Sequence, residues 1–170
     1  AWGVFDSFDR ADSAVVGGED AGCYRWAEFD EDGDQALRIG NDELWIDYNV
    51  GPSPTARAAL EGFRGKDVEI VTKLQAHYGG DGRFCGISYR MESEDGGLDS
   101  PGYHVLFGTE SVRLNYGKTL VSKSQHGIPV GAYHTVKIVA TGNSHKVYVN
   151  GGLVLEALDG QGDSGFVGVF

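Results

Sequence analysis

Hydrophobic and polar positions alternate with a period of two along most of the chain. In the segment 67–74, the even positions Val68, Ile70, Thr72 and Leu74 share one face. The same pattern recurs in six further segments, whose apolar faces are Leu44/Ile46/Tyr48, Cys85/Ile87/Tyr89/Met91, Tyr103/Val105/Phe107, Val112/Leu114/Tyr116, Val136/Ile138/Ala140 and Val147/Val149. Since successive side chains of a strand point to opposite faces, the pattern predicts many half-buried β-strands.

Turn-forming residues separate these segments. Asn150-Gly151 is the strongest signal, because both central positions of a type I′ hairpin turn need positive φ. No segment has a sustained helical period, and residues 55–62 are expected to form at most one helical turn. A chain of 170 residues fits a single domain. The expected fold is therefore all-β, a two-sheet antiparallel β-sandwich or jelly roll over residues 1–170.

Several segments, in this order, carry a family resemblance. They are 6–13 (DSFDRADS), 63–70 (FRGKDVEI), 86–90 (GISYR), 102–106 (GYHVL), 112–114 (VRL), 133–138 (YHTVKI), 146–151 (KVYVNG) and 163–169 (DSGFVGV). Together they resemble the concanavalin A-like lectin/glucanase superfamily, in its laminin-G-like branch. The resemblance covers nearly the whole chain and implies the same sandwich fold, but it says little about function.

The end of the chain departs from this family pattern. Relatives carry another strand after the segment 163–169, and that strand lies beside the N-terminal one, whereas this chain stops at Phe170. The resemblance therefore implies a missing terminal strand and an open edge near residues 2–8. An uncovered edge is an association site, so one of two outcomes is expected: further residues of the parent protein that supply the strand, or self-association or pairing with another protein chain at that edge.

The net charge and the hydropathy of the chain disfavour two classes of binding partner. The formal net charge of −11 disfavours nucleic acid, because such a surface repels phosphate backbones. No apolar stretch approaches 18 residues, so no membrane insertion is expected. Cys23 and Cys85 have no metal or redox spacing; they form either a disulfide or two buried free thiols.

A glycan-binding face is predicted around Trp45. Trp45 alternates away from Leu44 and Ile46, so its indole is expected on the face opposite the core, with Glu43, Asp47 and Asn49 near it. An exposed aromatic ring stacks on the apolar face of a pyranose, and polar neighbours bind its hydroxyls. The alternative is that Trp45 packs beneath a loop.

The lyase branch of the superfamily suggests a second group of ligand-binding residues. That branch uses Arg, His, Tyr and Gln on the concave face of one sheet. Arg90, His104, Arg113 and Tyr148 are compatible residue types on predicted strands. The characteristic Arg-x-Glu-x-Arg and Gln-x-His strings are absent, so the alternative is solvated strand residues without a catalytic role. All five histidines, His77, His104, His126, His134 and His145, are expected at the surface or in turns.

Calcium is the cofactor that the acidic segments suggest. Asp30, Asp32 and Asp34 concentrate oxygen ligands suited to calcium, although the segment is not an EF-hand loop. The alternative is a solvated Asp-Gly turn. By family resemblance, Asp6, Asp9 and Asp12, together with Asp159 or Asp163, offer a second calcium site.

Three functions follow from these observations. The leading interpretation is a non-catalytic recognition module, binding glycan, on a secreted, cell-surface or virion-associated protein. The second is a structural or assembly subunit of a virion, fibre or surface layer. The third is a glycoside hydrolase or polysaccharide lyase. Catalysis finds little support, because Glu43 and Asp47 lie about 13 Å apart along a strand, whereas a glycosidase pair is separated by about 5–9.5 Å.

Overall fold

A computed structural model of the chain describes residues 26–30, 37–40, 43–46, 56–76, 84–94, 100–124 and 126–170. Within these ranges the regular elements are all β-strands, which confirms the predicted all-β class. The strands are β1 (Trp26–Asp30), β2 (Leu37–Gly40), β3 (Glu43–Ile46), β4 (Ala56–Leu60), β5 (Val68–Gln75), β6 (Cys85–Met91), β7 (Tyr103–Phe107), β8 (Ser111–Tyr116), β9 (Lys118–Ser124), β10 (Tyr133–Thr141), β11 (Ser144–Val149), β12 (Gly152–Leu158) and β13 (Phe166–Val169). No helix of membrane-spanning length and hydropathy occurs in these ranges.

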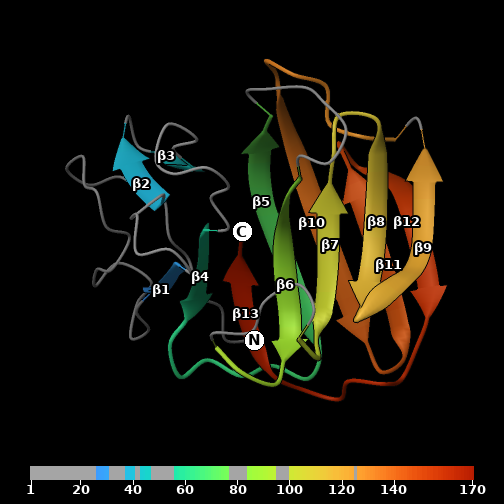
Figure 1. The fold of residues 1–170 in the computed structure, drawn as a ribbon. Coiled ribbons are helices and arrows are strands. Elements are labelled where there is room, and N and C mark those ends of the chain that lie inside the picture. The colour runs from blue at the N-terminus through green and yellow to red at the C-terminus, as the bar shows by residue number, and fades with distance from the viewer. Residues whose placement is uncertain are drawn as a thin grey trace.

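Two sheets form the sandwich. The larger has seven strands in the order β1-β4-β13-β6-β7-β8-β9, and the smaller has four in the order β12-β11-β10-β5. Every pairing between the described strands of these sheets is antiparallel, as predicted. Strands β6–β9 form one layer in front of β5 and β10–β12 (Figure 1). Strands β2 and β3 pair only with each other among the described strands.

The core lies between the two sheets and follows the predicted alternation. The seven-stranded sheet contributes Ile87, Tyr89, Tyr103, Val105, Phe107, Val112 and Leu114, and the four-stranded sheet contributes Val136, Ile138, Ala140, Val147 and Leu155. More exposed side chains alternate with buried ones along β10, and along β5 as far as Leu74. The period-two pattern therefore identified the inward face of these strands correctly.

The hairpin between β11 and β12 confirms the Asn-Gly prediction. Asn150 and Gly151 have φ values of 49° and 82°, as a type I′ turn requires. The Asn150 side chain also accepts a hydrogen bond from the Thr135 backbone N–H at 3.0 Å, which ties the turn to β10.

The expected helical turn over residues 55–62 is wrong, because this segment contains strand β4. Strand β4 pairs with β1 on one side and with β13 on the other. Ala58, Ala59 and Leu60 are buried there. Tertiary pairing and burial thus override the helical preference of alanine and leucine.

Strand β6 departs from simple alternation at Arg90. Arg90 has a φ of 51°, which is uncommon for a residue with a side chain, and the register of β6 against β13 shifts beside it. As a result, Met91 does not join Tyr89 in the core, as the alternation predicts. Met91 instead lines a hollow together with Ser88 and Gly168.

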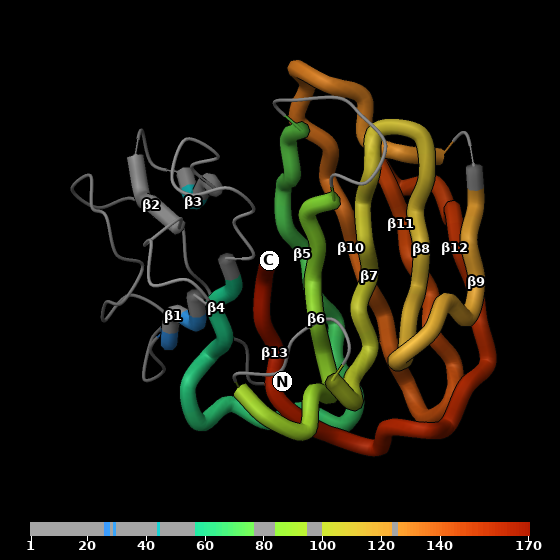
Figure 2. Tube along the Cα trace, viewed as in Figure 1, coloured from blue at the N-terminus to red at the C-terminus, as the bar shows by residue number. Residues whose placement is uncertain are grey.

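The last strand is an interior strand of the larger sheet. The connector 159–165 runs under the sandwich from β12 in one sheet to β13 in the other (Figure 2). Strand β13 then pairs with β4 and with β6. The predicted open edge near residues 2–8 lies outside the described residues.

Candidate functional site

Arg90 is a buried structural residue, which corrects its prediction as an exposed ligand-binding side chain. It is 2% exposed. Its guanidinium donates hydrogen bonds to the carbonyl oxygens of Lys66 (2.6 Å), Gly162 (2.9 Å) and Gly142 (2.9 Å). These carbonyls belong to three separate connections, so Arg90 joins them at one end of the sandwich.

His104 is also buried, which corrects both its ligand-binding prediction and its expected surface position. The Ser88 hydroxyl lies 2.7 Å from His104 Nδ1, and His104 Nε2 lies 3.3 Å from the Ser100 carbonyl oxygen. Because a carbonyl only accepts, Nε2 carries the proton and Nδ1 accepts from Ser88. The Phe170 ring meets the imidazole edge-on at 6.3 Å. The Ser88–His104 pair is buried and therefore not accessible to a ligand.

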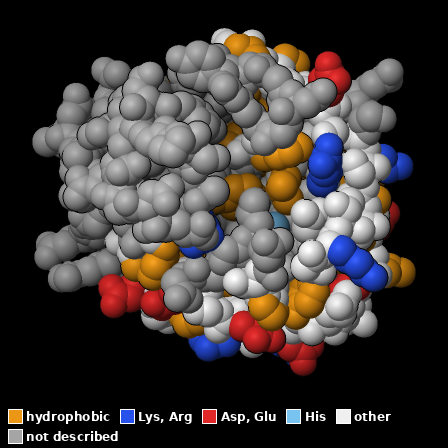
Figure 3. Space-filling model, viewed as in Figure 1, with side chains coloured by type: hydrophobic (Ala, Val, Ile, Leu, Met, Phe, Trp, Pro, Cys, Tyr) orange, Lys and Arg blue, Asp and Glu red, His pale blue; other side chains and the backbone are white. Residues whose placement is uncertain are grey.

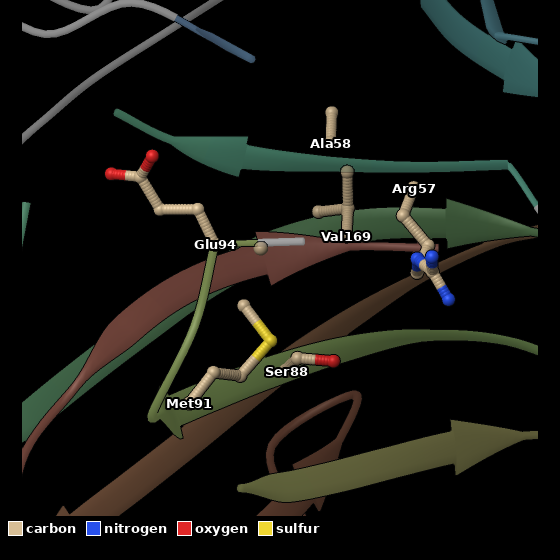
Figure 4. Close-up of a pocket in the computed structure, with 7 residues that line it drawn as sticks. Arg57, Ala58, Ser88, Met91, Glu94 and Val169 are labelled. Atoms are coloured by element: carbon tan, nitrogen blue, oxygen red, sulfur yellow. The ribbon is translucent and has the colours of Figure 1, made fainter. Parts of the chain in front are cut away.

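A small hollow lies on the outer face of the seven-stranded sheet, between β4 and β6. Its lining consists of Arg57, Ala58, Ser88, Met91, Glu94, Gly168 and Val169. Figure 4 shows Arg57 and Glu94 on opposite sides, with Met91 and Ser88 between them. Glu94 Oε1 accepts from the Gly62 backbone N–H at 2.8 Å. Since Ser88 and Met91 are buried, the hollow is not open to a polymer.

Arg113 and Tyr148 lie on different sheets. Arg113 belongs to β8 of the seven-stranded sheet, and its guanidinium stacks on Phe84 at 4.8 Å. On this face, apolar side chains gather at the centre with basic ones beside them (Figure 3). Tyr148 belongs to β11 of the four-stranded sheet. The structure therefore does not bring Tyr148 together with Arg90, His104 and Arg113, which lie on strands of the other sheet.

The outer face of the four-stranded sheet carries most of the large hydrophobic side chains that are exposed in the described residues. The large hydrophobic side chains found exposed in the described ranges are Val71 (59%), Val130 (48%), Tyr133 (49%), Leu153 (50%) and Leu158 (81%). Four of them occupy outward positions of β5, β10 and β12, while Val130 precedes β10 and pairs with Ala76 just beyond β5. We call this surface the Tyr148 face.

Tyr148 lies in the middle of one row across this face. Pairing places Lys137 of β10 opposite both Val71 of β5 and Tyr148 of β11, and Tyr148 opposite Leu153 of β12. A bulge between Val147 and Tyr148 sets this last pairing. The row thus has an aromatic ring near its centre and an aliphatic side chain at each end.

Two ion pairs lie on this face, and one of them includes Lys137 of the row. Lys137 Nζ lies 2.9 Å from Glu69 Oε2, and Lys146 Nζ lies 3.3 Å from Glu156 Oε1. All four side chains are well exposed, at 39–58%. Ion pairs this exposed contribute little to stability, so their donors and acceptors remain accessible to a ligand.

Sequence reasoning named Tyr148 as a candidate but did not name the residues that the structure places around it. The signal was present at Val71, an apolar residue at an outward position between Glu69 and Lys73. Without the register of β5, β10, β11 and β12, nothing in the sequence places Val71, Lys137 and Leu153 in one row. The alternation shows which face of the sheet a side chain occupies. Its neighbours on adjacent strands depend on how the strands pair, which the alternation does not show.

The predicted Trp45 site and calcium sites lie outside what the structure describes. Strand β3 contains Glu43 and Trp45, and β1 contains Asp30, but these side chains are not among the described ones. The other predicted ligands, Asp47, Asn49, Asp6, Asp9, Asp12, Asp32 and Asp34, fall outside the described residues. In the described part, no three His, Cys, Asp or Glu side chains group as a metal site.

Cys85 is a free thiol in the structure, and Cys23 lies outside the described residues. The Cys85 sulfur lies 3.8 Å from the Phe107 carbonyl oxygen. Burial raises the pKa of the Cys85 thiol to about 11, against the smaller effect of a backbone hydrogen bond. The thiol is therefore protonated at neutral pH and unreactive, as expected for a buried structural cysteine.

Solved structures with a similar fold include lectins, a binding module and glucanases. A β-1,3-1,4-glucanase (lichenase) from a mouse hindgut metagenome matches with a TM-score of 0.65 and 13% identity, over 99% of this chain and 85% of that one. The carbohydrate recognition domain of Emp46p, in its metal-free form, matches with a TM-score of 0.58 and 9% identity, over 85% and 79%. The fold is that of the concanavalin A-like lectins and glucanases.

A third similar structure is the carbohydrate-binding module CBM66 from Bacillus subtilis. It matches with a TM-score of 0.57 and 17% identity, over 67% of this chain and 71% of that one. No model of a known family matches the chain, and no curated protein matches it by sequence. At these identities the likeness concerns the fold alone.

Proposed function

We propose that this chain is a non-catalytic recognition module that binds glycan through the Tyr148 face. The observation that carries the proposal is the position of Tyr148, between exposed aliphatic side chains and beside two exposed lysine–glutamate pairs. A tyrosine ring stacks on the apolar face of a sugar, and charged groups bind its hydroxyls strongly. Carbohydrate-binding proteins among the similar structures support this function.

The carboxylates of this face support binding rather than hydrolysis. Glu69 of β5 and Glu156 of β12 are separated by three inter-strand steps, through Val139 and Lys146. That separation is about 14 Å, whereas glycosidases place their two carboxyl groups about 5–9.5 Å apart. Each glutamate is also paired with a lysine.

The test is binding to a panel of immobilised polysaccharides, with Tyr148→Ala as the principal variant. We expect the unmodified chain to bind one class of polysaccharide, and Tyr148→Ala to weaken that binding about tenfold or more, the loss of one good aromatic contact. Lys118→Ala is the control, because it truncates an exposed residue of β9, in the other sheet and outside the Tyr148 face. An unmodified chain that binds no polysaccharide would contradict the function.

A second candidate function is assembly with another protein chain. The exposure of Leu153 and Leu158 on a sheet face favours it, because aliphatic side chains pack against protein more readily than they bind sugar. Sedimentation of the purified chain at micromolar concentration tests this alternative, and a concentration-dependent dimer lost in Leu153→Asp would support it.

The proposal includes a secreted, cell-surface or virion-associated location. It also includes calcium as a possible cofactor, through Asp30, Asp32 and Asp34 or through Asp6, Asp9 and Asp12. These segments lie outside the described side chains, so their support is the acidic sequence and the family resemblance.

A further inference from the structure

We propose that the Tyr148 face takes an uncharged oligosaccharide chain that lies across the strands. This inference rests on the proposed glycan-binding function and adds the chemical class and the direction of the ligand. Two observations carry it: the row formed by Val71, Lys137, Tyr148 and Leu153, and the charge balance of the surrounding face.

The direction of the ligand follows from the row. Val71 and Leu153 lie at its two ends, three inter-strand steps apart, or about 14 Å. A chain that crosses the strands contacts the Tyr148 ring and both aliphatic ends. A chain that runs along β11 instead leaves Tyr148 and meets Lys146, which is paired with Glu156. Across the strands only Lys137 separates Val71 from Tyr148 and Leu153, so this direction offers the longer run of apolar contacts, and its length suits several sugar units.

The charge of the ligand follows from the two ion pairs. Each pair presents an ammonium donor beside a carboxylate acceptor, at 2.9 Å for Lys137–Glu69 and 3.3 Å for Lys146–Glu156. A sugar hydroxyl both donates and accepts, so neighbouring hydroxyls of a neutral sugar can use both members of a pair. A sugar carboxylate only accepts, and it would lie beside Glu69 or Glu156 while competing for a lysine that is already paired.

The net charge of the whole chain also favours an uncharged ligand. The outward positions of the four strands carry Lys73, Lys137 and Lys146 against Glu69 and Glu156, a formal charge of +1. The chain as a whole carries −11. A nearly neutral face on a strongly acidic molecule gives no attraction to a polyanion at long range and leaves neutral chains unaffected.

The size of the face favours an oligosaccharide over a second copy of the chain. Four strands about 4.8 Å apart and about eight residues long present roughly 500 Å². A stable protein interface buries about 800 Å² on each partner. The face is too small for a stable dimer by itself, whereas a short oligosaccharide needs only the Tyr148 row.

The experiment compares one polymer in two charge states. A neutral polysaccharide that binds in the panel is oxidised at its primary alcohols to carboxylates, which keeps the backbone and adds negative charge. We expect about tenfold weaker binding after oxidation, and binding of the neutral form that changes little between 50 mM and 500 mM salt. Preferential binding of uronic or sulfated polymers, or tighter binding after oxidation, would overturn the inference and leave the glycan-binding function intact.

Two glutamate variants test the role of the ion pairs directly. The double variant Glu69→Gln, Glu156→Gln removes both negative charges of the face and leaves the lysines unpaired. We expect weaker binding of the neutral polymer and tighter, salt-sensitive binding of the oxidised one. Glu110→Gln, an exposed glutamate in the turn before β8, is the matched control and should change neither. If the double variant changes neither affinity while Tyr148→Ala still weakens binding, the ion pairs have no part in recognition.

The same measurements separate failure of the inference from failure of the function. Binding of any glycan that is lost in Tyr148→Ala supports glycan recognition, whatever the charge of that glycan. If no glycan binds, or if Tyr148→Ala leaves the affinity unchanged, the site itself is wrong and the inference falls with it.

Discussion

The Tyr89 hydroxyl lies 2.9 Å from Nδ1 of His145, and this contact joins the two sheets inside the sandwich. Tyr89 belongs to β6 of the larger sheet and His145 to β11 of the smaller. The other imidazole nitrogen, Nε2, lies 2.9 Å from the carbonyl oxygen of Asp159. Because that oxygen only accepts, Nε2 carries the proton and Nδ1 accepts from Tyr89. A neutral His145 with the proton on Nε2 therefore satisfies both contacts.

Acid should destabilise the fold through His145. Burial lowers the pKa of His145 below its ordinary value of 6.5, the nearby Arg90 charge acts in the same direction, and the interactions with Asp159 oppose both. The unfolded chain then binds a proton that the folded chain does not, so the contribution is full above pH 6.5 and falls as the pH drops towards the folded pKa. We expect the free energy of unfolding to decrease below pH 6.5, by at most about 1.4 kcal/mol per pH unit. Urea unfolding between pH 5 and pH 8 measures it.

His145→Gln isolates this effect. Glutamine can accept from Tyr89 and donate to Asp159 but does not titrate, so the slope between pH 5 and pH 6.5 should be reduced. His126→Gln, in an exposed loop, should keep the slope. If His145→Gln keeps the full slope, another group is responsible.

A second acid transition should follow at lower pH, from Asp159. Burial by itself raises the pKa of this carboxyl, but hydrogen bonds from Tyr103 (2.6 Å) and from the Gln161 side chain and backbone outweigh it and lower the pKa below 3.8. A depressed carboxyl pKa contributes stability that is present above the ordinary value and lost as the pH falls through the folded value. Asp159→Asn should flatten the stability profile below about pH 4, and an unchanged profile there would contradict this account.

Arg90 should be the most costly buried polar residue to truncate. Arg90→Ala leaves the carbonyl oxygens of Lys66, Gly142 and Gly162 without their donor, and we expect a loss of about 3–5 kcal/mol. Arg90→Lys keeps the charge but cannot donate in three directions from a planar group, so it should recover only part of this. Arg113→Ala, which removes a partly exposed cation from Phe84, should cost about 1 kcal/mol or less and serves as control. Chemical denaturation gives all three values.

The sequence predicted the fold more fully than the site, for a physical reason. Period-two alternation depends on local backbone geometry, so it identified β5, β8 and β10 and the residues they bury. Arg90 and His104 occupy outward positions in that pattern, yet both are buried. Strand β6 departs from the alternation at Arg90, whose guanidinium reaches three connections at one end of the sandwich, and Ser100 and Phe170 lie against His104. His145 was expected at the surface because histidine is polar. It is buried at an inward position because Tyr89 and Asp159 bind both of its ring nitrogens, and the sequence does not show these partners.

Calcium should raise thermal stability if the acidic N-terminal segments bind it. A ligand that binds only the folded state stabilises by RT ln(1 + [L]/Kd), about 2.7 kcal/mol at a hundredfold excess over Kd. The measurement is the melting temperature in millimolar calcium and in chelator, for the unmodified chain and for Asp32→Asn with Asp34→Asn. Equal melting temperatures in both solutions would show that neither proposed site binds calcium.

A side chain at Gly165 should destabilise the fold. Its backbone dihedral angles are ones that any residue adopts, so the obstacle is the space around it. A Cβ built there would lie 2.1 Å from the Met91 carbonyl oxygen and 2.5 Å from the Arg90 carbonyl carbon, and both are backbone atoms that cannot turn away. Gly165 also exchanges two backbone hydrogen bonds with Gly65, at 2.9 and 3.1 Å, which hold the connector against the start of β5. Gly165→Ala must therefore push β6 and the connector apart, and we expect a loss of about 1–3 kcal/mol or more.

Gly160→Ala is the matched control for this substitution. Its Cβ would approach only side-chain atoms of the exposed Asn143, which can rotate, so we expect a change within about 0.5 kcal/mol. Both glycines lie in the connector that carries Asp159, so a difference between them measures the local backbone approach at Gly165 rather than a general preference for glycine in this segment. Urea unfolding at pH 7.5 gives both values, and equal stability of the two variants would show that β6 does not pack this closely against Gly165.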